Sequence, residues 1–336
     1  MHKPPRRMTA PRPRRPLALA ARSAMLVALS FFLSLAAAGP ARGDLRESTP
    51  LVESVSFESA DGSRLHGSLW RAERPGAGLL IVHGLESHAG WFERSGTPER
   101  LAAAGVTVLA YDRRGSGRSD GARGDTPSAQ AMLDDLEAAR SALARALAAQ
   151  GAGKVPLHAL ANCFGTRILL PFAARHPQAF VSLALTAPAT RMSRAADYGA
   201  GEKLKILLSS GDRRFATPVE DELFVDEGPA LEWIRADPLA LREVTARFLR
   251  ATARLTREMK RAARTLAIPA LVVLGSRDAM VDNARIRADF VARYRGPVEV
   301  LELDAEHYVD FTPRQRDLAA ALTTWIQQHT PAGGPR

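Results

Sequence analysis

Residues 155–169, VPLHALANCFGTRIL, decide the fold, and Cys163 stands at their centre. The short apolar run at 155–161 predicts a buried strand. The next residues predict a tight turn, and a helical run begins at Thr166, so the order is strand, turn, helix. A small residue two positions before a nucleophile and a glycine two positions after it allow the nucleophile to occupy a strained turn. The pentapeptide ANCFG at 161–165 has this pattern, with a thiol where the usual side chain is a hydroxyl.

The charge of the chain is concentrated at its N-terminus. Of the formal net charge of +10, residues 1–43 contribute eight basic side chains and no acidic one, so the remaining residues carry only +2. No basic patch interleaved with aromatic residues occurs in the remainder, and we therefore expect no nucleic-acid partner. With 336 residues and 46% hydrophobic content, the chain can bury the core of one large α/β domain or of two smaller ones.

Residues 1–43 have the pattern of a targeting segment. An arginine-rich start is followed by an apolar run at 24–38, and Ala36 and Ala38 fit a cleavage site of the A-x-A kind. This pattern predicts a signal peptide plus linker, and hence a periplasmic or secreted protein. An uncleaved anchor, with membrane association through this segment, is the alternative, although the run is short for a spanning helix.

Strand and helix signals alternate along most of the remaining chain. Two alternating runs around Asp61-Gly62 predict a β-hairpin. The predicted strands are 52–58, 65–70, 79–83, 106–111, 155–161, 181–186, 270–274 and 298–303, and the predicted helices are 98–104, 127–150, 166–176, 283–294 and 312–328, with Thr126 as the N-cap of the second. This alternation predicts the α/β class, with a mostly parallel sheet covered by helices on both faces.

The alternation stops between residues 187 and 268. These residues contain charged, helical segments such as 239–264 and no strong strand signal. An insertion of this length between two strands of a sheet is typical of a lid. We therefore predict a helical cap at 188–265 over a core formed by 44–187 and 266–330.

A nucleophilic thiol needs a base and a group that orients the base. In hydrolases built on such a sheet, the nucleophile, the acid and the histidine follow one another along the chain, each just after a strand. Asp278 follows the strand at 270–274 and His307 follows the last strand, so both occupy the required loops. Asp282 and Asp304 are weaker candidates for the acid.

Two backbone amides are candidates for an oxyanion hole. Leu85 N–H lies in the turn after the strand at 79–83, and Phe164 N–H directly follows Cys163. A buried, inert thiol is the alternative for Cys163, but a turn at a helix N-terminus beside an imidazole favours the thiolate. No cluster of metal-ligand spacing occurs, so we expect no metal and no cofactor.

Four stretches together resemble a known family. They are HGLESHAGW at 83–91, YDRRGSGRSDG at 111–121, residues 176–189, and residues 269–281 with the acid. Over about residues 52–328 the chain resembles the α/β-hydrolase superfamily, and within it the monoacylglycerol lipase and lysophospholipase branch, which is similar to the S33 serine aminopeptidases. This resemblance implies the α/β-hydrolase fold with a helical cap. Cysteine in place of the nucleophilic serine is similar to dienelactone hydrolases and polyhydroxyalkanoate synthases.

The resemblance also implies an activity. It predicts a hydrolase of carboxylic esters, of lipid-like acylglycerol or lysophospholipid type, which uses Cys163, Asp278 and His307 and a covalent acyl-enzyme. An acyltransferase with the same thioester intermediate and a non-catalytic lipid-binding homologue are the alternatives. The substrate-binding residues stay open, although several apolar cap residues suit an acyl tail: Leu204, Ile206, Leu207, Leu208, Phe215, Phe224 and Trp233.

Overall fold

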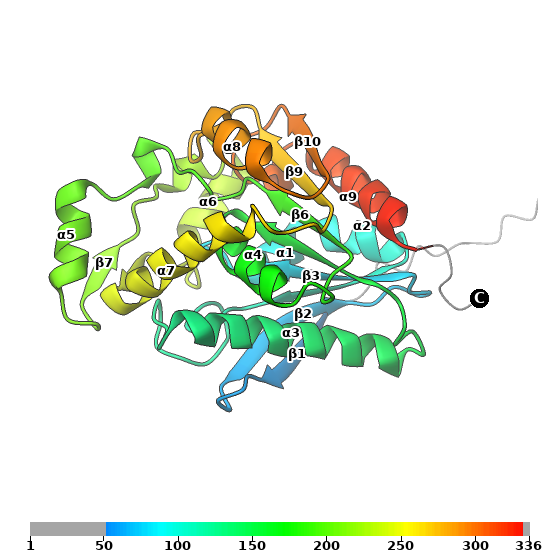
Figure 1. Ribbon diagram of the computed structural model, residues 1–336. Helices are drawn as coiled ribbons and strands as arrows, with labels where there is room; N and C mark the ends of the chain where they lie inside the picture. The colour runs from blue at the N-terminus through cyan, green and yellow to red at the C-terminus, as the bar shows by residue number, and fades with distance from the viewer. Residues whose placement is uncertain (1–51, 332–336) are drawn as a thin grey trace, which may run out of the picture. The chain divides into compact units, whose positions relative to one another are not determined.

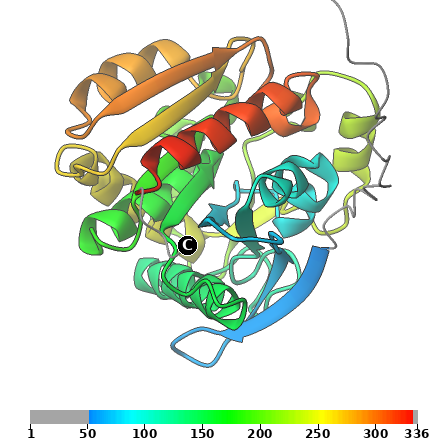
Figure 2. The ribbon, with the colours of Figure 1, turned by 90° about the vertical axis from the view of Figure 1, so that its right-hand side faces the viewer.

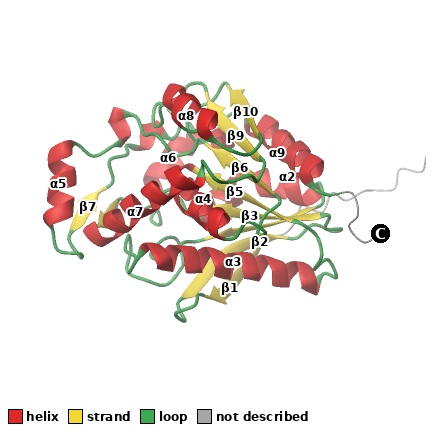
Figure 3. Ribbon diagram, viewed as in Figure 1, coloured by secondary structure: helices red, strands yellow, loops and turns green. Residues whose placement is uncertain are grey.

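One twisted sheet of eight strands forms the centre of the molecule (Figure 3). The computed structural model describes residues 52–331, so the predicted signal peptide or anchor lies outside the described residues. The strands are β1 (Val52–Glu58), β2 (Arg64–Trp70), β3 (Ala77–Val82), β4 (Val106–Tyr111), β5 (Leu157–Asn162), β6 (Ser182–Thr186), β9 (Ala270–Gly275) and β10 (Val298–Leu303). Their order across the sheet is β1-β2-β4-β3-β5-β6-β9-β10.

The sheet is parallel from β4 to β10, as the sequence predicts. β1 and β2 form the predicted antiparallel hairpin, with Gly62 at a φ of 80° in its turn. All six residues of β3, of β4 and of β9 are buried. Strands that are apolar on both faces need layers on both sides.

Helices supply these two layers (Figures 1 and 2). α2 (Thr97–Ala103) and α9 (Gln315–His329) pack together on one face. On the other face α4 (Thr166–Arg175) lies between α3 (Ala129–Ala149) and α7 (Ala246–Ala262), with α8 (Asn283–Asp289) farther along the sheet. The described residues thus form the predicted α/β class.

The start of α3 differs from the sequence prediction. Ser128, and not Thr126, is the N-cap, because the Ser128 hydroxyl accepts a hydrogen bond from Ala131 N at 3.1 Å. The Thr126 hydroxyl instead donates to Ser128 O. A short helix before α2, α1 (Ala89–Ser95), was not predicted.

The residues that follow β6 contain α5 (Ala200–Leu208) and α6 (Pro229–Ala236). They also contain a short antiparallel ladder of β7 (Arg214–Ala216) and β8 (Glu243–Thr245), in a segment that the sequence predicts to be helical. α5 and β7 lie at one end of the molecule (Figure 1). The long helix α7, the last helix within the predicted cap, lies along α4. Among residues 52–331, no helix is long and apolar enough to cross a membrane.

Candidate active site

Cys163 occupies a strained turn between β5 and α4. Its φ is 44°, a left-handed conformation that a non-glycine residue adopts at a cost. The turn lies close to the backbone of β3, because a Cβ atom on Gly165 would stand 2.1 Å from Val82 O. Glycine is therefore required two residues after the cysteine, as the sequence pattern predicts. Cys163 itself is 5% exposed.

Asp278 and His307 meet at the carboxyl ends of β9 and β10. His307 Nδ1 lies 2.8 Å from Asp278 Oδ2, and both side chains are fully buried. The other carboxylate oxygen, Oδ1, accepts hydrogen bonds from the backbone N–H groups of Met280 and Val281 at 2.8 and 3.0 Å. The carboxylate is thus held by its own loop and fixes the orientation of the imidazole.

The two rival carboxylates have other partners. Asp282 is the N-cap of α8 and accepts a hydrogen bond from Arg285 N at 3.0 Å. Asp304 forms an ion pair with Arg277 at the surface. Of the three acidic residues considered from the sequence, only Asp278 contacts His307.

The second ring nitrogen of His307 is available for proton transfer. Nε2 is buried and has no hydrogen-bond partner within the described residues. Burial lowers the pKa of His307, but the charges of Asp278 and Cys163 outweigh it, so that the pKa is raised above its ordinary value. A raised pKa favours the imidazolium, which is the partner that a cysteine thiolate requires.

The turn after β3 presents one N–H group of the predicted oxyanion hole. The carbonyl oxygen of Gly84 accepts hydrogen bonds from His83 Nδ1 at 2.9 Å and from Arg113 Nη2 at 2.7 Å. In a trans peptide the C=O and N–H groups point in opposite directions, so these two donors turn Leu85 N–H the other way. Leu85 N has no hydrogen-bond partner in the part of the chain that the structure describes.

Arg113 links this turn to the side chain of Phe164, the residue that carries the other predicted donor. Its Nη2 also donates to Leu85 O at 2.8 Å, and its guanidinium lies 4.8 Å from the ring centroid of Phe164. Arg113 is only 2% exposed and has no carboxylate partner among residues 52–331. Burial lowers its pKa to about 10, so it remains charged at neutral pH. A buried cation thus contacts the carbonyl groups of the turn that contains Leu85 and the side chain of Phe164, a feature that the sequence pattern did not reveal.

Two buried side chains after the oxyanion turn bind the segment that follows β6. Glu86 accepts hydrogen bonds from the Thr217 hydroxyl and, at 2.8 Å, from Arg242 Nη1. Burial raises the pKa of Glu86 to about 7, although both of these contacts act to lower it. His88 Nε2 lies 2.9 Å from Asp237 Oδ2. These contacts fix residues from the predicted cap beside Leu85.

An aromatic cluster connects the same segment to His307. The rings of Phe224 and Tyr308 lie 5.2 and 5.0 Å from the ring of Trp91, and Phe224 lies 6.1 Å from the His307 ring. Tyr308 N donates to Phe224 O at 2.9 Å. Phe224, which lies in the predicted cap, therefore borders the candidate catalytic histidine.

The other apolar residues that the sequence suggested for an acyl tail lie elsewhere. Leu204, Leu207 and Leu208 are 56, 64 and 76% exposed on α5. Ile206 and Phe215 are buried in a small separate cluster. Of that set, Phe224 contacts His307 and Trp233 packs on Trp91, so the others do not line the candidate site.

The remaining histidines have structural contacts. His66 lies 3.1 Å from Asp112, and His158 Nδ1 lies 2.7 Å from the Ser182 hydroxyl. Among the described residues, no group of three or more His, Cys, Asp or Glu side chains could hold a metal ion.

The architecture matches solved hydrolases. A soluble variant of monoglyceride lipase from Saccharomyces cerevisiae has a TM-score of 0.72 at 16% identity, over 88% of this chain and 100% of that one. The monoacylglycerol lipase of Paleococcus ferrophilus has a TM-score of 0.67 at 18% identity, over 79% of this chain and 99% of that one. These similarities show the α/β-hydrolase fold.

Sequence comparison identifies the family. A protein described as monoacylglycerol lipase from Mycolicibacterium smegmatis is 27% identical over 281 residues, which cover 82% of this chain and 96% of that protein. The family model of the S33 serine aminopeptidases matches residues 73–307, from the strand before the oxyanion turn to the candidate catalytic histidine. The chain is therefore an α/β-hydrolase enzyme that belongs to the serine aminopeptidase S33 family.

Proposed function

We propose that the protein hydrolyses carboxylic esters through a Cys163–His307–Asp278 triad. The observation that carries this proposal is the buried contact of 2.8 Å between His307 and Asp278, in the loops predicted for base and acid. Cys163 lies in a strained turn and precedes both residues, so the three follow the order nucleophile, acid, histidine along the chain. Family membership and the similarity to a protein described as monoacylglycerol lipase support an ester as the substrate.

In the acylation step, the Cys163 sulfur attacks the acyl carbon and the carbonyl oxygen becomes an oxyanion. The N–H groups of Leu85 and Phe164 stabilise this oxyanion. The imidazolium of His307 then protonates the leaving alcohol from Nε2, while Asp278 holds Nδ1–H and stabilises the positive charge. The product is a thioester on Cys163 and a free alcohol.

In the deacylation step, neutral His307 takes a proton from water, and the resulting nucleophile attacks the thioester carbon. The acid is released and the thiolate is restored. An alcohol that enters in place of water would receive the acyl group by the same route. The sulfur at position 163 is the observation that favours this second candidate, an acyltransferase, because thioesters transfer acyl groups readily.

A lipid-like substrate, such as an acylglycerol or a lysophospholipid, is the class that we propose. Phe224 supplies an apolar surface beside His307. The exposed leucines of α5 would suit contact with a lipid surface. We also propose that residues 1–43 direct export or anchor the protein at a membrane. Intact mass of the protein recovered from its native host distinguishes a cleaved leader from a retained one.

Steady-state kinetics of the full chain test the proposal. Hydrolysis of p-nitrophenyl butyrate and of a monoacylglycerol is compared for the parent, Cys163→Ala and His307→Ala, with and without an added alcohol acceptor. Ester hydrolysis predicts turnover that both substitutions abolish, and an acyltransferase predicts product that partitions to the acceptor. Saturable lipid binding without any turnover would contradict both and identify a binding protein.

A further inference from the structure

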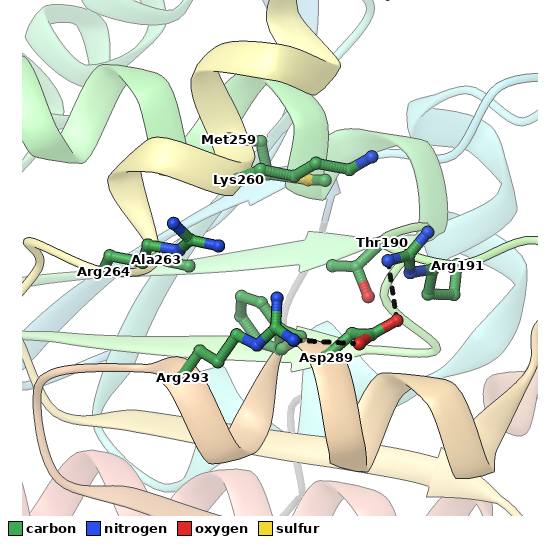
Figure 4. Close-up of a pocket in the computed structure, with 9 residues that line it drawn as sticks. Thr190, Arg191, Met259, Lys260, Ala263, Arg264, Asp289 and Arg293 are labelled. Atoms are coloured by element: carbon green, nitrogen blue, oxygen red, sulfur yellow. Dashed lines mark ion pairs between the residues drawn. The ribbon is translucent and has the colours of Figure 1, made fainter.

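A polar cavity of about 50 Å³ lies between the end of α7, α8 and the loop after β6. Its polar lining side chains are Thr190, Arg191, Lys260, Arg264, Asp289 and Arg293. Figure 4 shows the guanidinium groups of Arg264 and Arg293 directed into the space that Thr190 and Arg191 border from the other side. A cavity needs a volume of about 10–15 Å³ to hold one water molecule, so this cavity has room for a chemical group of several non-hydrogen atoms.

The lining carries an excess of positive charge. Asp289 pairs with Arg191 at 2.6 Å and with Arg293 at 3.6 Å. Lys260 and Arg264 have no carboxylate partner in residues 52–331. Burial lowers the pKa of Lys260, and the charges of Arg191 and Arg167 lower it further. Four cations thus face one carboxylate, and an added anion would relieve their repulsion.

A buried hydroxyl in the same cavity lacks a partner. Thr190 is 8% exposed, and its Oγ1 atom is buried with no hydrogen-bond partner among the described residues. Buried hydroxyl groups are nearly always hydrogen-bonded in folded proteins. An acceptor oxygen in the cavity would satisfy this donor together with the neighbouring cations.

The end of α7 does not by itself explain these cations. Basic residues do stabilise a helix C-terminus by interacting with its last carbonyl groups. Here the carbonyl of Met259 accepts from Ala263 N, that of Ala262 from Thr265 N and Leu266 N, and that of Ala263 from Arg295 N. These carbonyls are satisfied without Lys260 or Arg264. Arg191, moreover, comes from a different loop.

We propose that this cavity binds a phosphate group. Its donors come from three separate elements and converge from different sides, which suits a tetrahedral oxyanion better than a planar carboxylate. Arginine forks are well matched to phosphate oxygens. The cavity accommodates the phosphate, and the rest of the ligand extends through its open side. The shared chemistry is that of a phosphate monoester, either a free metabolite or a lipid headgroup.

The phosphate site is separate from the candidate active site. None of its polar lining residues belongs to the triad or to the oxyanion hole. Backbone contacts nevertheless connect the two, because Ala189 N donates to Cys163 O at 3.1 Å and Asp282 N donates to Arg191 O at 3.0 Å. Because the two sites share no polar side chain, binding of phosphate can be measured whether or not the protein hydrolyses esters.

Titration of the full chain with inorganic phosphate tests the proposal. Thermal unfolding and calorimetry are recorded at constant ionic strength, with chloride as the balancing anion. A ligand that binds only the folded state raises the Tm, so we expect phosphate to raise it above the chloride value. The double variant Lys260→Ala/Arg264→Ala should bind phosphate at least about tenfold more weakly, since charged hydrogen bonds are lost.

A matched variant controls for loss of net charge. Arg257→Ala/Arg261→Ala removes two exposed cations from the same helix, neither of which lines the cavity. This variant should bind phosphate like the parent. Equal weakening in both variants, or no difference between phosphate and chloride, would overturn the proposal, because binding would then reflect general charge.

Two further ligands distinguish the sources of the phosphate. Glycerol 3-phosphate represents a free monoester, and phosphatidylcholine vesicles with added phosphatidic acid represent a lipid headgroup. Binding of glycerol 3-phosphate that depends on Lys260 and Arg264 supports a free ligand. Vesicle binding with the same dependence supports a lipid. Failure of both ligands to bind in this manner would refute a phosphate monoester site.

Discussion

Replacement of Arg113 by methionine tests how the proposed oxyanion hole is positioned. Arg113 donates to both Gly84 O and Leu85 O and lies over the Phe164 ring. Methionine has a similar volume and no donors, so it removes the contacts that aim Leu85 N–H. We expect the substitution to lower kcat for p-nitrophenyl butyrate while the chain stays folded.

The magnitude follows from the contacts. Loss of one oxyanion donor typically costs about 10²–10³ in kcat, and we expect a decrease of about 10². Two charge-assisted hydrogen bonds are lost, each of which contributes about 1.5–3 kcal/mol. Removal of a buried cation that has no carboxylate partner offsets part of this loss. The free energy of unfolding should therefore fall by only about 2 kcal/mol, and KM should change little.

The adjacent arginine supplies the control. Arg114 forms ion pairs with Asp135 at 2.6 Å and with Asp61 at 2.7 Å, away from the oxyanion turn. Arg114→Met leaves the buried Asp135 without its cation, which should cost about 3–5 kcal/mol of stability. The kcat of the folded protein should stay unchanged.

Urea unfolding and steady-state kinetics of both variants separate the two roles. If Arg113→Met keeps kcat within about threefold of the parent, the loss of transition-state stabilisation is under about 1 kcal/mol. Such a result would refute a positioning role for Arg113. A large loss of kcat in fully folded Arg114→Met protein would also contradict the assignment of the positioning role to Arg113 alone.

Three further substitutions test the site, the turn and the cap. Asp278→Asn should lower kcat by about 10³–10⁴ in ester assays without unfolding the chain, because the imidazole loses its fixed tautomer; unchanged kcat would exclude Asp278. Gly165→Ala should cost about 3 kcal/mol in urea unfolding, since its Cβ meets Val82 O, whereas Gly201→Ala, with nothing within 4 Å, should cost nothing. Glu86 has a pKa of about 7 against an ordinary 4.5, so the folded state binds more protons between these values and stability falls as pH rises through them, by about 2–4 kcal/mol. Glu86→Gln should remove this part of the pH dependence. If its stability varies with pH as that of the parent does, burial does not raise the pKa of the Glu86 carboxyl.

The sequence predicted those parts of the fold that depend on local pattern. The strands Val52–Glu58, Val106–Tyr111 and Val298–Leu303 have the predicted bounds, because their apolar runs end at turn residues. Strands β7 and β8 were missed because three residues are too few to show a period. The N-cap of α3 was misplaced since threonine and serine two residues apart give similar signals.

The contact between Asp278 and His307 follows from their loops at neighbouring strand ends, so chain order was enough to anticipate it. The contacts around Leu85 were not predictable in this way. Arg242 reaches Glu86 across 156 residues of sequence, and Asp237 reaches His88 across 149. Arg113 lies in a charged loop whose composition suggests exposure, yet its side chain is buried under the oxyanion turn. Such pairings depend on how distant segments of the chain pack together, which local sequence pattern does not encode.

The identity of the nucleophile is the central claim, and trapping of an acyl-enzyme tests it most directly. The full chain is mixed with p-nitrophenyl butyrate, quenched in acid, and analysed by intact mass and peptide mapping, beside Cys163→Ala. The account predicts one butyryl group on the peptide that contains Cys163, labile to hydroxylamine as a thioester, and no adduct in Cys163→Ala. Turnover that persists in Cys163→Ala, or an adduct on another residue, would contradict it.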